Sequence, residues 1–163
     1  MIKYLVMDVD GTLTDGKIYI GPSGEVFKSF SVKDGYAIHS LLRDHCIIPI
    51  IITGRNSEIV MKRANELNIK EIYQGVSNKL TVLSSIIERE GQSFENVAYI
   101  GDDLNDIECM TAVKNAGGYV GCPSDAVDEV KRVVSYICIS KGGCGAVREF
   151  IMKLITINSG DNQ

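Results

Sequence analysis

The chain has 163 residues, 45% of them hydrophobic, which is enough to bury the core of one domain spanning residues 1–163. Its 17 basic and 21 acidic side chains give a formal net charge of −4 without any basic run, which argues against a nucleic-acid partner. The N-terminus lacks the pattern of a signal peptide, and no apolar run is long enough to span a bilayer. We therefore expect a cytoplasmic protein with no membrane partner.

The first predicted element is a buried strand over residues 5–7, which runs directly into Asp8 and Asp10. In an extended backbone these two acids leave the same face, so their carboxylates converge just beyond the carboxyl end of the strand. Two such acids repel each other unless a cation lies between them. A simple turn is the structural alternative. A calcium loop is disfavoured, because Thr12 and Leu13 stand where that loop needs an acid and a glycine.

A hairpin, a helix and a strand are predicted next. Residues 17–20 and 25–30 alternate apolar and polar side chains around a Gly-Pro-Ser-Gly turn, which predicts a hairpin that projects as a flap near the carboxylates. Asp34 is the expected N-cap of the following helix. The run over residues 47–52 is apolar throughout, as in a central parallel strand, and it ends at Thr53.

The second half of the chain alternates helices with strands. We expect Asn56 or Ser57 to cap one helix and Ser77 to cap another, which carries Lys79 in its first turn. A buried strand over residues 97–100 then ends in acid. The other predicted elements are strands at 72–73, 119–120 and 136–139, helices at 107–113, 124–133 and 146–157, and a frayed polar tail at 158–163.

This alternation predicts an α/β fold with a doubly wound, mostly parallel, Rossmann-like sheet and a β-hairpin flap. The hairpin, one helix and one strand fill the segment between Asp10 and Thr53, and one helix and one strand fill the segment between Lys79 and Asp102. Neither segment leaves room for a cap domain.

The five cysteines are odd in number and include no Cys-x-x-Cys pair, so they favour neither disulfides nor a zinc site. We expect them to be reduced core residues. A Cys/His nucleophile built from Cys46 or Cys144 with His39 or His45 is the alternative that these residue types leave open.

Four polar clusters stand at strand ends or at a helix start in this order: Asp8 with Asp10, Thr53, Lys79, and Asp102 with Asp103. This ordered set resembles the four motifs of the haloacid dehalogenase superfamily of phosphohydrolases, over residues 1–106. The resemblance implies a phosphatase that works through an aspartyl-phosphate. A receiver domain also combines acids, a threonine and a lysine, but its accepting aspartate follows a middle strand rather than the first.

Physical chemistry gives the acids roles that agree with those in the family. A phosphate dianion repels a carboxylate nucleophile unless positive charge offsets the repulsion. We expect Asp8 to be the nucleophile and, with Asp102, to supply oxygens to Mg²⁺. By resemblance, Asp10 adds its backbone carbonyl to the metal, while its side chain acts first as general acid and then as general base.

The remaining motif residues are expected to support the phosphoryl group. Thr53 offers a hydroxyl and a nearby N–H, and Lys79 brings a point charge within reach of both Asp8 and the phosphate. Asp103 and Asp106 either support the metal ligands or cap the following helix.

Within the superfamily, the chain resembles the capless tetrameric phosphatases that act on 3-deoxy-D-manno-octulosonate 8-phosphate. The matching stretches are Arg63 and residues 31–36, 52–55, 73–79, 101–104 and 142–149. The resemblance implies a small-molecule sugar acid phosphate as substrate. It also implies a homotetramer in which a neighbouring subunit closes the site and the glycine-rich segment reaches towards an adjacent subunit. Such closure excludes water and strengthens the charge interactions inside.

An acidic keto sugar phosphate needs cations for its carboxylate as well as its phosphate. His39 stands where the octulosonate enzymes usually carry arginine, and a neutral imidazole cannot grip a carboxylate as guanidinium does. This keeps a nonulosonate (KDN or N-acylneuraminate) 9-phosphate open as the substrate. A noncatalytic oligomerisation module related to sialic-acid-activating enzymes is a further alternative. The substrate-binding residues implied by the resemblance are Lys33, Asp34, Gly35, His39, Arg55 and Arg63.

Overall fold

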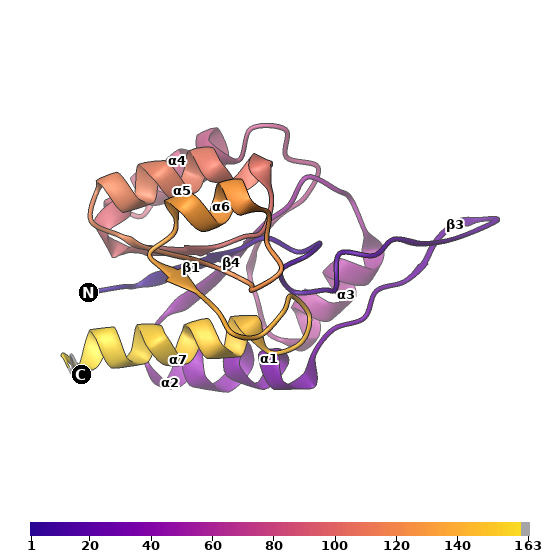
Figure 1. The fold of residues 1–163 in the computed structure, drawn as a ribbon, viewed down its shortest axis with the longest axis horizontal. Coiled ribbons are helices and arrows are strands. Elements are labelled where there is room, and N and C mark those ends of the chain that lie inside the picture. The colour runs from indigo at the N-terminus through magenta and orange to yellow at the C-terminus, as the bar shows by residue number, and fades with distance from the viewer. Residues whose placement is uncertain (161–163) are drawn as a thin grey trace.

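The fold is organised by a six-stranded sheet in which every paired strand runs parallel to its neighbours, in the order β5-β4-β1-β6-β7-β8 (Figure 1). The computed structural model describes residues 1–160. The chain starts in the middle of the sheet, extends it first to one side and then to the other, and so confirms the predicted doubly wound class. The strands are β1 (Tyr4–Met7), β4 (Ile48–Ile52), β5 (Glu71–Tyr73), β6 (Val97–Ile100), β7 (Tyr119–Cys122) and β8 (Tyr136–Ile137).

Helices cover both faces of this sheet, which explains why its strands are apolar throughout rather than alternating. One face packs against α1, α3 and α7, and the other against α4, α5 and α6 (Figure 1). No helix in the described part of the chain combines the length and apolar character needed to cross a lipid bilayer. The helices are α1 (Val32–Tyr36), α2 (Leu42–Asp44), α3 (Glu58–Glu66), α4 (Lys79–Arg89), α5 (Ile107–Asn115), α6 (Asp128–Val133) and α7 (Ala146–Ser159), with a π-helical turn η1 (Ala37–Leu41) and 3₁₀ turns η2 (Phe94–Asn96) and η3 (Leu104–Asp106).

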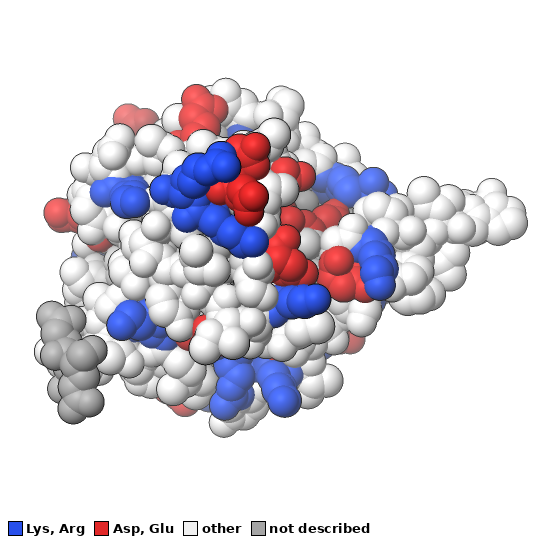
Figure 2. Space-filling model, in the orientation of Figure 1, with Lys and Arg blue, Asp and Glu red and all other residues white. Residues whose placement is uncertain are grey.

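The predicted hairpin is present as β2 (Tyr19–Gly21) and β3 (Gly24–Phe27), and it projects away from the body of the molecule (Figure 1). The rings of Tyr19 and Phe27 stack with their centroids 4.2 Å apart. Several apolar side chains of this hairpin are exposed, and its surface is mostly uncharged in Figure 2. These exposed residues are Ile18, Ile20, Val26 and Phe27.

Two predicted helix caps are wrong. The N-cap of α1 is Ser31, whose extended backbone lets its Oγ accept a hydrogen bond from the N–H of Asp34, so Asp34 lies inside the helix. Similarly, α4 begins one residue later than predicted, because Asn78 rather than Ser77 accepts from the N–H of Thr81. The cap of α3 is Ser57, one of the two predicted candidates.

The end of the chain is more ordered than its polar composition indicated. Asn158 was expected to lie in a frayed tail, but it belongs to α7 and its side chain exchanges two hydrogen bonds of 2.8 Å with the backbone of Ile2. The last three residues of the predicted tail, 161–163, lie outside the described residues. The predicted helix 124–133 and strand 136–139 are both shorter, as α6 and β8.

The cysteines follow the prediction only in part. Cys109, Cys122 and Cys138 are buried thiols, whereas Cys46 and Cys144 are exposed. Cys46 lies in the turn before β4 and Cys144 in the turn before α7, and both turns are at the surface.

Candidate active site

Three sequence-distant segments meet at the carboxyl edge of the sheet. Asp8 follows β1, Thr53 follows β4 and Asp102 follows β6, and these three strands are neighbours in the sheet. Since the strands are parallel, their carboxyl ends lie side by side at the point where the chain changes direction across the sheet. In Figure 2, acidic side chains gather where the hairpin leaves the body of the molecule, with Lys and Arg around them.

A buried lysine joins two of the acids. Nζ of Lys79 donates to Oδ1 of Asp8 and to Oδ1 of Asp106, each at 2.8 Å, and the lysine is only 4% exposed. Burial alone would lower the pKa of Lys79, but the two carboxylates outweigh this effect and raise it. The lysine therefore provides a permanent positive charge beside Asp8.

Asp106 has a supporting role that the sequence left open. Its Oδ1 also accepts a hydrogen bond of 2.7 Å from the Tyr99 hydroxyl, and its Oδ2 accepts from the N–H groups of Asp102 and Asp103. Both oxygens are thus occupied, and Asp106 fixes the loop after β6 as well as Lys79. A Cβ on Gly101 would lie 2.4 Å from Cγ of Asp106, so this close approach requires glycine.

Asp102 packs against the turn that follows β1. Its Oδ1 accepts a hydrogen bond of 2.9 Å from the Thr12 hydroxyl. Gly11 has a φ of +89°, and a Cβ at this position would lie 2.0 Å from Oδ2 of Asp102. Only glycine permits both this backbone conformation and this contact.

The acids at these strand ends form a site that fits a divalent cation. Ligand oxygens of Asp8, Asp102 and Asp106 lie within 4.8 Å of one another. Because Asp106 has four hydrogen-bond donors, the oxygens available to a cation are those of Asp8 and Asp102. Burial and the neighbouring Asp106 raise the pKa of Asp8 to about 6, and burial and Asp8 raise the pKa of Asp102 to about 7. A Mg²⁺ ion, which prefers carboxylate oxygens, would relieve this repulsion.

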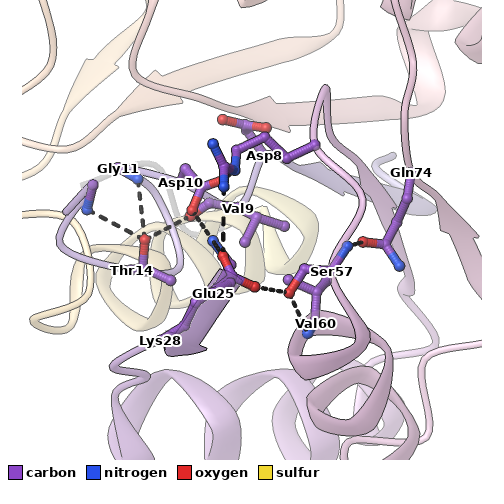
Figure 3. A network of polar contacts seen from close by, with 12 residues as sticks. Asp8, Val9, Asp10, Gly11, Thr14, Glu25, Lys28, Ser57, Val60 and Gln74 are labelled. Carbon is purple, nitrogen blue, oxygen red and sulfur yellow. Dashed lines mark hydrogen bonds and ion pairs between the residues drawn. The ribbon is translucent and has the colours of Figure 1, made fainter. Parts of the chain in front are cut away.

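Asp10, the predicted acid and base, lies in a second charge network that is shown in Figure 3. Nζ of Lys28, from the chain just after β3, contacts Oδ1 of Asp10 and lies 2.9 Å from Oε1 of Glu25. Glu25 also accepts from the Ser57 hydroxyl, and the N–H of Ser57 donates to Gln74 at 2.8 Å. The network therefore ties the hairpin to the turn after β1 (residues 8–14) and to the start of α3.

Sequence reasoning missed Lys28, Glu25 and Ser57 as parts of this site. The alternation in 25–30 places Lys28 on the same face as Phe30, which packs against the core. This alternation was the sequence signal that Lys28 points inward. A lysine on an inward face needs a buried carboxylate partner, and the side chain of Lys28 is only 1% exposed.

Of the predicted substrate-binding residues, the structure brings Arg55 to the acids. Its Nε lies 3.8 Å from Oδ2 of Asp10 and its Nη2 lies 3.8 Å from Oε1 of Glu25, and the side chain is 47% exposed. Arg55 is therefore held loosely and is available to an anion. Lys33 is exposed, and it lines an open groove beside the start of α7.

The other predicted substrate-binding residues are not brought to the acids of their own chain. Arg63 lies over the ring of Phe30 and fills the space where a Cβ on Gly35 would be 2.2 Å from its Nη2. His39 lines a cavity of about 420 Å³ beside the start of β4, at the opposite edge of the sheet. Asp34 is buried against the first turn of α7.

The glycine-rich segment also has a partner within its own chain. Residues 142 and 143, which the resemblance placed near an adjacent subunit, pack against the turn after β1, and the N–H of Gly143 donates to the carbonyl of Thr12 at 3.1 Å. This segment therefore packs on the turn after β1 of its own chain.

Comparison with known proteins gives a consistent result. Residues 51–151 match the sequence model of haloacid dehalogenase-like hydrolases. The chain is 43% identical to the 3-deoxy-D-manno-octulosonate 8-phosphate phosphatases of Salmonella typhi and Escherichia coli, over 91% of this chain and 76% of each relative.

Solved structures of similar fold belong to the same class of phosphatase. The phosphatase of the same name from Moraxella catarrhalis, in complex with a magnesium ion, a phosphate ion and a KDO molecule, superimposes with a TM-score of 0.87 at 40% identity, covering 96% of this chain and 86% of that one. The cobalt-bound deoxy-D-mannose-octulosonate 8-phosphate phosphatase from Haemophilus influenzae gives a TM-score of 0.87 at 35% identity, covering 98% and 90%.

The raised pKa values predict how stability depends on pH. Without metal, the folded protein holds protons on Asp8 and Asp102 that the unfolded chain has released, so the free energy of unfolding should fall as pH rises from about 4 to about 7. Mg²⁺ requires both carboxylates ionised, so its stabilising increment should grow over the upper part of this range. Urea titrations with EDTA or MgCl₂ measure both effects. An increment that is independent of pH, or that persists in Asp102→Asn, would contradict this assignment.

Loss of the Lys28 charge should release the hairpin. In Lys28→Met, Asp10 and Glu25 lose a buried counter-charge, and we expect the free energy of unfolding to fall by about 3 kcal/mol. The matched control is Lys17→Met just before β2, where an ion pair with Asp15 is exposed and contributes at most about 1 kcal/mol. Urea unfolding and limited proteolysis of the hairpin report the difference. Equal free energies of unfolding and equal proteolysis rates for the two variants would contradict a stabilising role for Lys28.

Proposed function

Because this chain belongs to the haloacid dehalogenase-like hydrolases and is a phosphatase of that family, we propose that its substrate is 3-deoxy-D-manno-octulosonate 8-phosphate and that it uses Mg²⁺. The observation that carries the proposal is the arrangement at the strand ends, where Asp8 lies between the buried Lys79 and the carboxylate of Asp102. The named relatives, which align with at least 91% of the chain, support the same substrate.

The first half of the reaction transfers the phosphoryl group to the protein. A carboxylate oxygen of Asp8 attacks phosphorus while the bond from phosphorus to the sugar oxygen breaks, and Asp10 gives its proton to that oxygen. Lys79 and the hydroxyl of Thr53 stabilise the charge on the phosphoryl oxygens. Bound Mg²⁺, held by Asp8, Asp102 and the backbone carbonyl of Asp10, would supply further positive charge against the repulsion between the substrate and the nucleophile.

The second half restores the protein. Asp10, now a carboxylate, takes a proton from a water molecule that attacks phosphorus of the aspartyl-phosphate, and the bond to Asp8 breaks. Inorganic phosphate leaves, and both acids regain their starting states. The contact of Lys28 with Asp10 holds this carboxylate in place while its proton is moved.

The sugar acid also presents a carboxylate. Arg55 is the exposed cation nearest to the catalytic acids among the predicted substrate-binding residues, and its two ion pairs at 3.8 Å are loose enough to exchange for a substrate carboxylate. We therefore assign Arg55 to the acidic end of the substrate. A nonulosonate 9-phosphate carries the same carboxylate and phosphate on a longer carbon chain, so it is the competing substrate in the activity assay below.

The site also needs a cover. Between β1 and α1 the chain has only the hairpin, and the described residues include no cap domain. The exposed apolar residues of this hairpin, Ile18, Ile20, Val26 and Phe27, fit an interface between subunits. We propose that the protein is a homotetramer in which a neighbouring subunit closes each site. The five free thiols fit a reducing compartment, and we place the enzyme in the cytoplasm.

Phosphate release tests the activity. With Mg²⁺ we expect the wild-type protein to hydrolyse the octulosonate 8-phosphate faster than a nonulosonate 9-phosphate, and Asp8→Asn to lose roughly 10³-fold or more in kcat because the nucleophile is removed. Asp44→Asn, an exposed aspartate paired with Arg43, is the matched control and should keep full activity. The noncatalytic alternative predicts the same background rate for all three proteins. Faster hydrolysis of the nonulosonate 9-phosphate would contradict the octulosonate assignment and identify the nonulosonate as the substrate.

Disrupting the apolar hairpin tests the assembly. A lysine at Ile20 and at Val26 would put two charges into the proposed interface, and we expect the tetramer to dissociate and activity to fall with it. Met152→Lys, an exposed apolar residue of α7, serves as the control. Size-exclusion chromatography with light scattering measures the mass. A fully active wild-type monomer would refute closure by a neighbour.

A further inference from the structure

Asp34 caps a helix other than its own. It lies in the first turn of α1 and is only 2% exposed, and its Oδ1 accepts from the N–H of Arg148 at 2.8 Å while its Oδ2 accepts from the N–H of Gly145 at 3.2 Å. These N–H groups belong to the start of α7, where Gly145 stands at the N-cap and offers no side chain. A carboxylate at this position satisfies free N–H groups and complements the helix dipole.

The segment just before α7 lies directly on the turn after β1, residues 8–14, which is the catalytic turn of the proposed function. A Cβ on Gly142 would be 1.8 Å from the carbonyl oxygen of Gly11, and one on Gly143 would be 2.6 Å from the backbone of Thr14. The N–H of Gly143 donates to the carbonyl of Thr12 at 3.1 Å. The two segments thus pack backbone against backbone, and a small shift of one must displace the other.

The catalytic turn in turn contacts Asp102, a proposed metal ligand. The N–H groups of residues 12–14 point to the carbonyl of Val9, and the hydroxyl of Thr12 donates to Oδ1 of Asp102. A continuous series of contacts therefore runs from Asp34 through the start of α7 and Gly143 to Thr12 and Asp102.

We infer that Asp34 is a positioning residue, which holds the segment 142–145 against the catalytic turn and thereby fixes Asp102 for metal binding. This inference rests on the proposed function in taking the turn of residues 8–14 as catalytic and Asp102 as a metal ligand. It replaces the expected substrate contact of Asp34, because both carboxylate oxygens already have backbone partners in a buried position. Because Asp34 is only 2% exposed, a substrate could reach its remaining lone pairs only by displacing the start of α7.

Hydrogen exchange tests the inference without any substrate. In Asp34→Ala we expect the peptides covering residues 9–16 and 140–148 to exchange roughly 5- to 30-fold faster, because the cap that holds them is lost. Asp34→Asn keeps one oxygen that can accept from α7, but its amide N–H₂ group faces the other backbone N–H. We therefore expect a smaller increase in the exchange rate of the same two peptides. The matched control is Ser31→Ala, which removes the cap of α1 and should accelerate exchange in 31–38 alone.

The two Asp34 variants keep the test decisive. If Asp34→Ala fails to fold, Asp34→Asn decides alone. Wild-type exchange in 9–16 together with faster exchange at the start of α7 would overturn the inference. So would a loss of protection in 9–16 in the Ser31→Ala control, because the effect would then come from α1 in general.

Kinetics separate positioning from substrate contact. With Mg²⁺, a positioning role lowers kcat by the same factor, roughly 10-fold or more for Asp34→Ala, with p-nitrophenyl phosphate and with the sugar acid phosphate. It also raises the Mg²⁺ concentration needed for half-maximal thermal stabilisation. A rise in KM for the sugar acid phosphate alone would instead show that Asp34 contacts the substrate, and it would contradict the positioning role. If the wild-type protein hydrolyses neither compound, the proposed function fails while the exchange experiment still decides the role of Asp34.

Discussion

The site depends on one buried lysine that stands between two buried carboxylates. Without Nζ of Lys79, Asp8 and Asp106 would face each other with Asp102 close by, in a region from which water is largely excluded. Such a cluster of like charges is stable only when cations are built into it or bound by it. The lysine supplies one positive charge permanently, and the free oxygens of Asp8 and Asp102 leave room for one that can be bound.

Much of this arrangement was predictable from the chain. The continuous apolar runs in β1, β4 and β6 indicated parallel strands covered on both faces, and parallel strands bring their carboxyl ends to one edge. Asp8 and Thr53 follow their strands directly and Asp102 follows β6 after one glycine, so all three were expected at the same edge of the sheet. The position of Lys79 followed from its place in the first turn of a helix that packs on the same sheet.

The rest depends on partners that are distant in sequence and leave no local signal. Asp34 has the residue type of an N-cap, but Ser31 stands nearer the helix start, and the N–H groups that Asp34 meets lie 111 and 114 residues away. Lys28 shows only the alternation of a short apolar and polar segment, and its partner Asp10 lies 18 residues earlier in the chain. Asn158 was assigned by polarity to a free end, yet it pairs with a backbone 156 residues away.

The cap that Asp34 provides also imposes an order on biogenesis. The turn after β1 leaves the ribosome before the glycines that pack against it and before the helix that holds them. Until residue 148 has emerged, Asp34 lacks one of the two N–H groups that hold the glycines in place. The packing on this turn is therefore completed only after translation of the start of α7, and a product that stops before α7 would carry the acids without the contacts that hold the turn.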